Sequence, residues 1–412
     1  MIYYESFELK NGLRVIVHQD EQVPTVAINV LYNVGSRDEH PDKTGFAHLF
    51  EHLMFSGSAH VPQYDAVLQR AGGECNAFTN ADLTSYYLIL PAQNAEIGFW
   101  LESDRMLSLN FNPHALETQR KVVIEEYKQR YLNQPYGDVW LRLLPMAYKV
   151  HPYRWPTIGR DISHIEKATL EDVKEFFFKY YRPNNAILSV AGNISLEQVK
   201  CFADKWFGSI PAGGIPVRNL PSEPSQTQSR SQWVQAKVPA NAIYKVWHMC
   251  NRLHPDYYAT SLLSDILGRG KSSRLHRFLV EQERLLVSVS AGISGTIDEG
   301  LFTVSAKLAQ GVSLEQAERA IEEVISRLQE DLSENELQKV KNKAESTLAF
   351  GEMEVLSRAI GLAYATLLGD TDLVNQQGRK IQAVSKEDIL RVARQLFKPE
   401  NCSTLYYQAM LN

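Results

Sequence analysis

The sequence lacks the long apolar segments and the N-terminal signal that would place it in or across a membrane. No apolar run among its 412 residues approaches the roughly 20 needed to cross a bilayer. The N-terminus, MIYYESFELKNGLRVIVHQD, has no basic region, no apolar stretch of useful length and no small-residue cleavage site. We therefore expect a cytoplasmic protein, or a periplasmic one if a signal has been removed from the chain.

The sequence also has few cysteines and no concentration of positive charge. Its four cysteines, Cys75, Cys201, Cys250 and Cys402, lie far apart and form no CxxC pair, so we expect reduced thiols rather than a disulfide framework. The net charge of −5 is spread along the chain without a long basic tract. A nucleic acid is therefore not expected as a partner, because its backbone selects for clustered lysine and arginine.

The sequence contains an internal repeat. The segment IEKATLEDVKEFFFKYYRPNNAILSVAG at 165–192 matches IQAVSKEDILRVARQLFKPENCSTLYYQ at 381–408, with Pro183 and Pro399 separated by 216 residues. Each copy predicts a helix with a Thr or Ser cap, a proline-marked turn and an apolar strand. A chain of this length is expected to hold two or more domains, so the repeat predicts two domains of the same fold.

A segment rich in Pro, Gly, Ser and Gln, IPAGGIPVRNLPSEPSQTQSRSQ at 210–232, separates the two copies and is typical of an exposed linker. Within each half, short β-branched strands alternate with amphipathic helices. We therefore predict an α+β protein with two tandem α/β-sandwich domains, each a mostly antiparallel sheet with helices packed on it. The predicted domains are 1–212 and 231–412, with a linker at 213–230.

The stretch HLFEHLMFSG at 48–57 contains the candidate metal-binding and catalytic residues. His48 and His52 are four residues apart, so on a helix both imidazoles lie on one face and can reach one metal ion. Glu51 borders the same face and is placed to take a proton from water without being a ligand. Burying three such groups without partners would cost several kcal/mol, which argues against a purely structural role.

A catalytic zinc ion needs a third protein ligand and an open position for water. The candidate segment is TQRKVVIEEYKQRY at 118–131, a helical run with paired acids, Glu125 and Glu126, next to an apolar face. The residues alone leave open which acid would bind the metal, and one of the two is expected on a solvated helix face. Seven other histidines have no recognisable ligand spacing and are interpreted as structural or surface residues; they are His60, His114, His151, His164, His248, His254 and His276.

The HxxEH pattern of His48–His52 resembles the inverted zinc signature of the inverzincin peptidases, among them pitrilysin, insulin-degrading enzyme and mitochondrial processing peptidase. The resemblance extends through further blocks in the same order and covers nearly the whole chain. These blocks are NGLRVIVHQD, VGSRDEHPDKTGFAHLFEHLMFSG, GGECNAFTNADLTSYYLILP, RKVVIEEY, HPYRWPTIG, YYRPNNAILSVAGN and GRGKSSRLHRFLVE.

The resemblance implies one Zn²⁺ per chain, held by His48, His52 and the second acid of VVIEE, which is Glu126; Glu125 is the alternative. It also implies that only the first domain keeps the metal site, and the positions near 264–268 indeed carry no histidine. The family often has an acid seven residues before the third ligand. This chain has Gln119 there, a departure expected to weaken the tuning of the site without abolishing it.

The resemblance further implies that substrate binds as an added strand along 75–90, with Asn76 and Ala77 as backbone contacts. In the second domain the family commonly shows an Arg and a Tyr that contact substrate or the developing oxyanion. Here Arg274 is present, but Val287 stands where the Tyr is expected. We therefore expect the metal-bearing subunit of a dimer, with a heterodimer partner carrying the Arg/Tyr pair favoured over a homodimer that uses Arg274 alone.

The expected function is a zinc-dependent endopeptidase that cleaves peptides or unfolded segments in an enclosed dimer chamber, with Glu51 as general base. The alternative, from a different functional class, is a non-catalytic core or assembly subunit of a larger complex. The four residues His48, Glu51, His52 and Glu126 favour the enzyme, because a scaffold has no need of all four.

Overall fold

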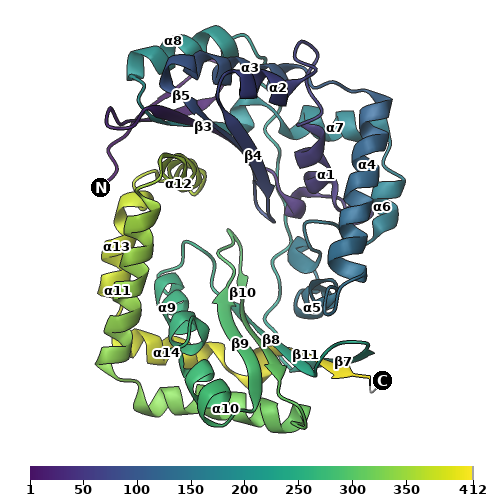
Figure 1. The fold of residues 1–412 in the computed structure, drawn as a ribbon, viewed down its shortest axis with the longest axis vertical. Coiled ribbons are helices and arrows are strands. Elements are labelled where there is room, and N and C mark those ends of the chain that lie inside the picture. The colour runs from purple at the N-terminus through teal and green to yellow at the C-terminus, as the bar shows by residue number, and fades with distance from the viewer. Residues whose placement is uncertain (411–412) are drawn as a thin grey trace. The chain divides into compact units, whose positions relative to one another are not determined.

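The computed structural model describes residues 1–410, which form two compact units (Figure 1). Unit 1 comprises 1–127, 155–220 and 349–376, and unit 2 comprises 128–154, 221–348 and, among the described residues, 377–410. Over the described chain, no helix combines the length and the apolar character needed to cross a membrane.

Unit 1 is built on a six-stranded sheet in the order β1-β2-β6-β3-β5-β4. Strands β2 and β6 are parallel, and the other neighbouring pairs are antiparallel. The strands are β1 (Glu5–Glu8), β2 (Arg14–Gln19), β3 (Thr25–Tyr32), β4 (Glu74–Thr79), β5 (Thr84–Pro91) and β6 (Ala186–Gly192). The helices are α1 (Phe46–Leu53), α2 (Tyr64–Arg70), α3 (Ala95–Leu107), α4 (Pro113–Tyr127), α6 (Ile162–Glu166), α7 (Leu170–Tyr180), α8 (Leu196–Phe207) and α12 (Val355–Leu367).

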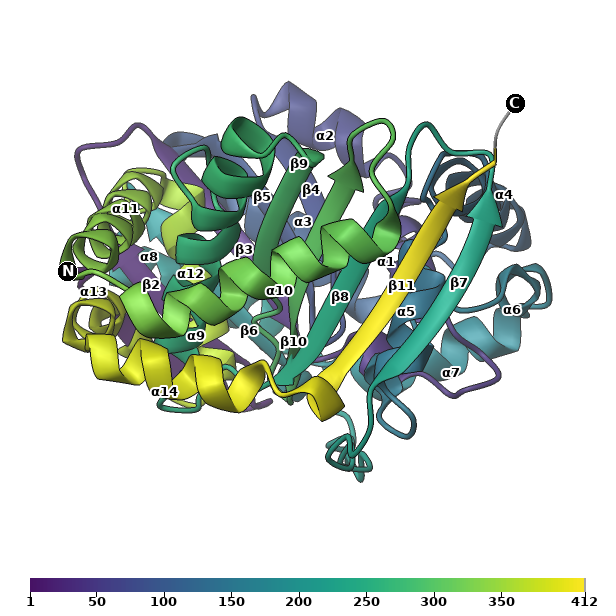
Figure 2. The same cartoon turned by 90° about the horizontal axis from the view of Figure 1, so that it is seen from below.

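Unit 2 is built on a five-stranded sheet in the order β7-β11-β8-β10-β9, which Figure 2 shows with α10 lying across it. The strands are β7 (Arg230–Ala236), β8 (Ala242–Met249), β9 (Leu286–Ile293), β10 (Gly300–Leu308) and β11 (Cys402–Ala409). The helices are α5 (Val139–Ala147), α9 (Tyr257–Gly268), α10 (Leu314–Asp331), α11 (Glu334–Gly351) and α14 (Lys386–Leu396), while α13 (Leu373–Ala383) crosses the boundary between the units.

The two sheets have the same topology. Strands β2, β6, β3, β5 and β4 of unit 1 correspond in order to β7, β11, β8, β10 and β9 of unit 2, and each sheet contains one parallel pair at the equivalent place. Helices α7 and α14 begin with the same capping box, in which Thr169 and Ser385 bond the third helical residue. The predicted fold class is thereby confirmed, including the mostly antiparallel sheets with packed helices.

Two helices are exchanged between the halves of the sequence. Helix α12, from the C-terminal half, packs on β3 and β6 of unit 1, and α5, from the N-terminal half, packs on the sheet of unit 2. Val355 at the start of α12 lies 216 residues after Val139 at the start of α5, which is the repeat spacing. The exchange is therefore reciprocal between equivalent helices.

The exchanged helix α12 completes the core of unit 1. Leu362 packs among Ile16, Leu31 and Ile187 on one face of the sheet. At its first turn, Arg358 Nη1 donates to Asp20 Oδ2 at 2.7 Å. The contiguous ranges 1–212 and 231–412 therefore do not describe the compact units, because hydrophobic patterning shows that a helix is buried but not which sheet buries it.

The segment predicted as a linker contains the boundary between the units at Leu220 and Pro221. It has no helix or strand between Phe207 and Arg230, as its composition predicts. It is nevertheless anchored at several points. In unit 1, Arg218 pairs with Asp38, and in unit 2 the Glu223 carboxylate accepts three consecutive backbone N–H groups at 149–151.

The exchange predicts that residues 1–212 alone do not form a stable domain, because one face of their sheet loses α12 and exposes apolar side chains to water. Adding a peptide of residues 349–376 should restore a cooperative thermal transition, followed by circular dichroism. A peptide of 334–348, from helix α11 and from unit 2, is the control and should restore nothing. A cooperative transition in the isolated fragment would contradict the prediction.

Candidate functional site

Helix α1 carries the HxxEH residues on its half-buried side. Its apolar residues recur at a spacing of three and four and are buried; they are Phe46, Leu49, Phe50 and Leu53. The ring of Phe50 stacks on Tyr181 with 5.2 Å between centroids. The helix is fixed by this apolar side, which leaves His48, Glu51 and His52 partly exposed on the other.

The first turn of α1 is held by Glu39. Its buried carboxylate accepts the backbone N–H groups of Gly45 at 2.9 Å and Ala47 at 2.8 Å, two donors that a helix N-terminus leaves unsatisfied. Burial raises the pKa of Glu39 to about 8, while these two hydrogen bonds lower it. Glu39 cannot be recognised from the sequence, because a lone acid six residues before a glycine matches no known helix-capping pattern.

Gly45 begins α1 with φ of +89°, a conformation that favours glycine. A Cβ at this position would lie 2.6 Å from Ile158 O, so the close approach also requires glycine. Gly45 thus turns the chain into α1 at the point where Glu39 binds it.

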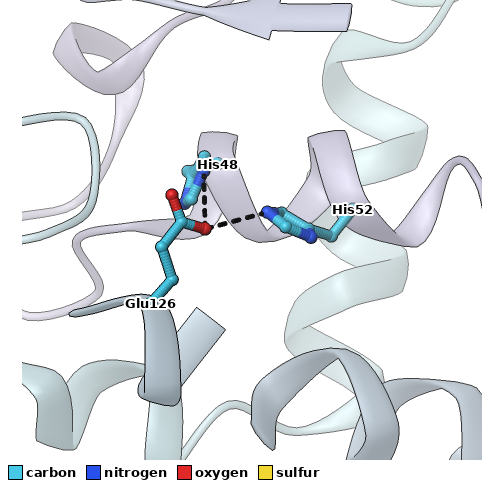
Figure 3. Close-up of side chains that lie close together, drawn as sticks. All are labelled: His48, His52 and Glu126. Carbon is cyan, nitrogen blue, oxygen red and sulfur yellow. Dashed lines mark ion pairs between the residues drawn. The ribbon is translucent and has the colours of Figure 1, made fainter. Parts of the chain in front are cut away.

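Helix α4 brings Glu126 to the two histidines (Figure 3). Glu126 Oε2 lies 3.4 Å from His52 Nε2 and 3.7 Å from His48 Nε2. The imidazole rings are 4.8 Å apart between centroids and nearly perpendicular. Glu125, the residue before Glu126 on α4, is exposed. Of the two acids left open by the residue pattern, the structure thus brings Glu126 to the histidines.

The three side chains fit a zinc ion. Their ligand atoms all lie within 4.8 Å of one another. Donors at the usual Zn–N and Zn–O distances in a tetrahedral site are about 3.3 Å apart, close to the observed 3.4 and 3.7 Å. Two imidazoles and one carboxylate are the ligand set of a catalytic zinc with an open position. Among the described residues, this is the sole cluster of that kind.

Glu51 lies one residue before His52 and is half-buried. Burial raises the pKa of the Tyr87 phenol, and the negative charge of Glu51 raises it further. The same charge is felt by Tyr86 and Tyr181, whose pKa values are raised chiefly by burial. Three tyrosine side chains, Tyr86, Tyr87 and Tyr181, therefore lie within electrostatic reach of the Glu51 carboxylate.

Gln119 lies on α4, two turns before Glu126. Its Nε2 donates to Ser56 Oγ at 3.1 Å, just beyond the C-terminal end of α1. The residue that departs from the family pattern therefore supplies a neutral tie between the two helices that carry the cluster.

Asn76 and Ala77 lie on β4, the edge strand of the unit 1 sheet, which packs beside α1 (Figure 1). The Ala77 N–H donates to Asn76 Oδ1 at 2.8 Å, and the Asn76 side chain is exposed. The unpaired edge of β4 has the geometry needed to accept an added strand.

Arg274 is buried in unit 2 and engaged in ion pairs. Its Nε and Nη2 donate to Glu336 at 3.0 and 2.7 Å, and Nη1 donates to Asp331. Arg274 thus ties the segment before η6 (His276–Gln282) to the α10–α11 connection. Val287, where a Tyr was expected, is 65% exposed on the edge strand β9.

Comparisons with known proteins show the family of the chain. The family model "Insulinase (Peptidase family M16)" matches residues 14–159, and "Peptidase M16 inactive domain" matches 167–344. Zinc protease PqqE of Helicobacter pylori is 31% identical over 98% of this chain and 92% of that protein. The chain belongs to peptidase family M16. The resemblance identified from the sequence is thus confirmed.

Further relatives give the same assignment. Zinc protease YmxG of Bacillus subtilis is 27% identical, covering 95% of both chains. The crystal structure of a protease from Helicobacter pylori superposes with a TM-score of 0.94 at 29% identity, covering 99% of this chain and 100% of that one. The "inactive domain" match includes α9, the equivalent of α1, whose sequence YYATSLLSDILG has no histidine.

The Glu39 contact predicts a specific pH dependence of stability. Because its folded pKa of about 8 lies above the unfolded value near 4.5, Glu39 stabilises the fold most below pH 4.5, and this contribution is lost as pH rises towards 8. In Glu39→Gln, the slope of unfolding free energy against pH should flatten in this window by up to about 1.4 kcal/mol per pH unit. Urea unfolding at several pH values measures it.

The matched control for this experiment is Asp42→Asn, whose side chain is 78% exposed and which should leave the slope unchanged. Equal slopes in wild type and Glu39→Gln would show that Glu39 does not change its protonation in this range.

Proposed function

We propose that this M16 protein is a zinc-dependent endopeptidase and the metal-bearing subunit of its assembly. The observation that carries the proposal is the convergence of His48 Nε2, His52 Nε2 and Glu126 Oε2 from two helices that are distant in sequence. The relatives named zinc proteases support the same chemistry.

His48, His52 and Glu126 would hold the zinc ion, and the ion would supply Lewis-acid polarisation of the scissile carbonyl and acidify water. Glu51 would accept the proton of the attacking water and return it to the leaving amine. General acid–base catalysis of this kind contributes about 10²–10⁴-fold. Gln119 and Glu39 would act indirectly, by holding α4 and α1 in register.

The substrate would lie as an added strand along the free edge of β4. Main-chain hydrogen bonds to a sheet edge grip a peptide without reading its sequence, so peptides and unfolded segments are the expected substrates. In this structure the Ala77 N–H donates its hydrogen bond to the Asn76 side chain. Strand addition would therefore require Asn76 to turn away.

A partner chain is part of the proposal. A valine at position 287 cannot donate a hydrogen bond, and Arg274 is committed to Glu336 and Asp331. Both observations support a heterodimer in which a sibling chain brings the Arg/Tyr pair into an enclosed chamber. A homodimer is the second arrangement, and it would need an oxyanion donor other than Arg274.

A non-catalytic core subunit is the competing function, and the match of 167–344 to an inactive domain is the observation in its favour. That match begins at residue 167, however. The three residues of the metal cluster all lie within 14–159, the segment matched by the insulinase model. A scaffold would have no need to keep three ligands within bonding distance of one ion.

The metal ligands can be tested by substitution. His48→Ala, His52→Ala and Glu126→Ala should each reduce zinc from about one ion per chain to near zero, measured by mass spectrometry after dialysis. Glu51→Gln should keep the zinc and lose about 10²–10⁴-fold in peptide cleavage. Glu125→Ala is the matched control and should keep both. If zinc were retained in Glu126→Ala but lost in Glu125→Ala, the third ligand would be Glu125 and the assignment of Glu126 would be wrong.

The partner can be tested by reconstitution. The purified chain should bind zinc fully but cleave peptides slowly, because a missing oxyanion donor costs about 10²–10³-fold. Mixing with a sibling chain that carries the Arg/Tyr pair should raise the rate by about 10²-fold or more and produce a mixed dimer in light scattering. Full activity of the chain alone, as a homodimer, would contradict the heterodimer.

A further inference from the structure

The end of strand β3 in unit 1 is covered by an arginine side chain. Asn185 Nδ2 donates to Asn33 O at 3.2 Å and to Tyr180 O at 2.8 Å, which closes the turn into β6. Arg218 Nη2 donates to the same Asn33 O, and its Nε donates to Asp38 Oδ1 at 2.6 Å. The Asp38 side chain is only 1% exposed. A guanidinium group therefore fills this place in unit 1.

The end of strand β8 in unit 2 repeats the same arrangement without the arginine. Asn401 Nδ2 donates to His248 O and to Leu396 O, both at 3.0 Å, as Asn185 does in unit 1. Among the hydrogen bonds of residues 1–410, none from an arginine or lysine side chain reaches His248 O. Beside it lies a pocket of about 430 Å³, in the region of Figure 2 where the turn between α14 and β11 meets the end of β8.

The ring of His248, a residue that lines this pocket, has one nitrogen without a hydrogen-bond partner among the described residues. His248 Nε2 lies 3.0 Å from Ala147 O and donates to it, which leaves Nδ1 with a lone pair. Nδ1 is buried and has no hydrogen-bond partner within residues 1–410. Burial lowers the pKa of His248, so the ring stays neutral and keeps this acceptor at neutral pH.

The charge of the pocket is negative on balance. Glu299 and Glu400 line it, and within the described chain neither carboxylate takes part in an ion pair. Asp256 also lines it but is bound by Arg391 through both oxygens, at 2.6 and 2.8 Å. Lys398 supplies the one ammonium group of the lining. A cation that also donates several hydrogen bonds matches this combination of acceptors.

We infer that the pocket of unit 2 binds the guanidinium group of an arginine, at the place where unit 1 seats its own Arg218. Guanidinium donates through five N–H groups in a plane, so it can bond a backbone carbonyl, an imidazole nitrogen and a carboxylate together. The protein contains one occupied copy of the arrangement and one open copy. The inference does not depend on the zinc site.

The occupied copy also indicates how the arginine arrives. In unit 1 the segment that carries Arg218 is held by Asn184, whose side chain both donates to Gly213 O at 2.7 Å and accepts from its N–H at 3.0 Å. Glu400, which lines the pocket, stands at the equivalent position in unit 2. An arginine on an extended peptide segment is therefore the ligand, rather than a free small guanidine.

The test is a binding titration of the full chain with a synthetic peptide of residues 213–219, GGIPVRN, followed by calorimetry and by NMR of labelled histidine rings. The peptide should bind and shift the His248 signal, which is assigned from its loss in His248→Phe. The same peptide with citrulline in place of arginine, equal in shape but uncharged, should bind at least about tenfold more weakly. N-acetyl-arginine methylamide carries the same guanidinium group but lacks the extended segment, so it should bind more weakly than the peptide.

The variants Glu299→Gln and Glu400→Gln, singly and together, should weaken binding, by about tenfold for the pair. The matched control is the pair Glu330→Gln and Glu334→Gln, exposed acids of unit 2 outside the pocket, which should bind the peptide as wild type does. Thermal unfolding confirms that each variant is folded. Absence of binding, equal binding of the citrulline peptide, or unchanged binding by the Glu299/Glu400 pair would each overturn the inference.

Discussion

The attachment of α1 at its first turn governs the geometry of the whole site. A helix of eight residues has little stability of its own in water, so its position depends on tertiary contacts. Glu39 accepts two hydrogen bonds from the N-terminal N–H groups, and the packing of Phe50 on Tyr181 supplies the apolar contact. Because both histidines project from this short helix, a small rotation of α1 would separate them from Glu126.

The two units show what the same fold does with and without that requirement. In unit 1 the helix after β3 is two turns long and keeps three ionisable groups on one side, which costs desolvation that only a bound cation offsets fully. In unit 2 the equivalent α9 has twelve residues, nine of them buried, and its sequence has no histidine. Five of the nine buried residues of α9 are apolar: Ala259, Leu262, Leu263, Ile266 and Leu267.

Local features of the fold were predictable from the sequence, whereas non-local ones were not. The capping boxes at Thr169 and Ser385 and the proline turns are set by residues close together in the chain, so their patterns identify them. The cluster was predictable because helical spacing fixes His48 and His52, although the residue pattern left Glu125 and Glu126 open until the structure brought Glu126 to the histidines. The exchange of α5 and α12, the role of Glu39 and the burial of Arg274 depend on partners distant in sequence, which no local pattern encodes.

The exchange also makes the site of unit 1 depend on the second half of the sequence. Helix α12 belongs to the C-terminal half, yet it covers the face of the unit 1 sheet formed by Ile16, Leu31 and Ile187. An uncovered apolar face of this kind would favour aggregation over a folded unit. The cluster of His48, His52 and Glu126 requires unit 1 to be folded, so it depends on the second half through the helix that this half contributes.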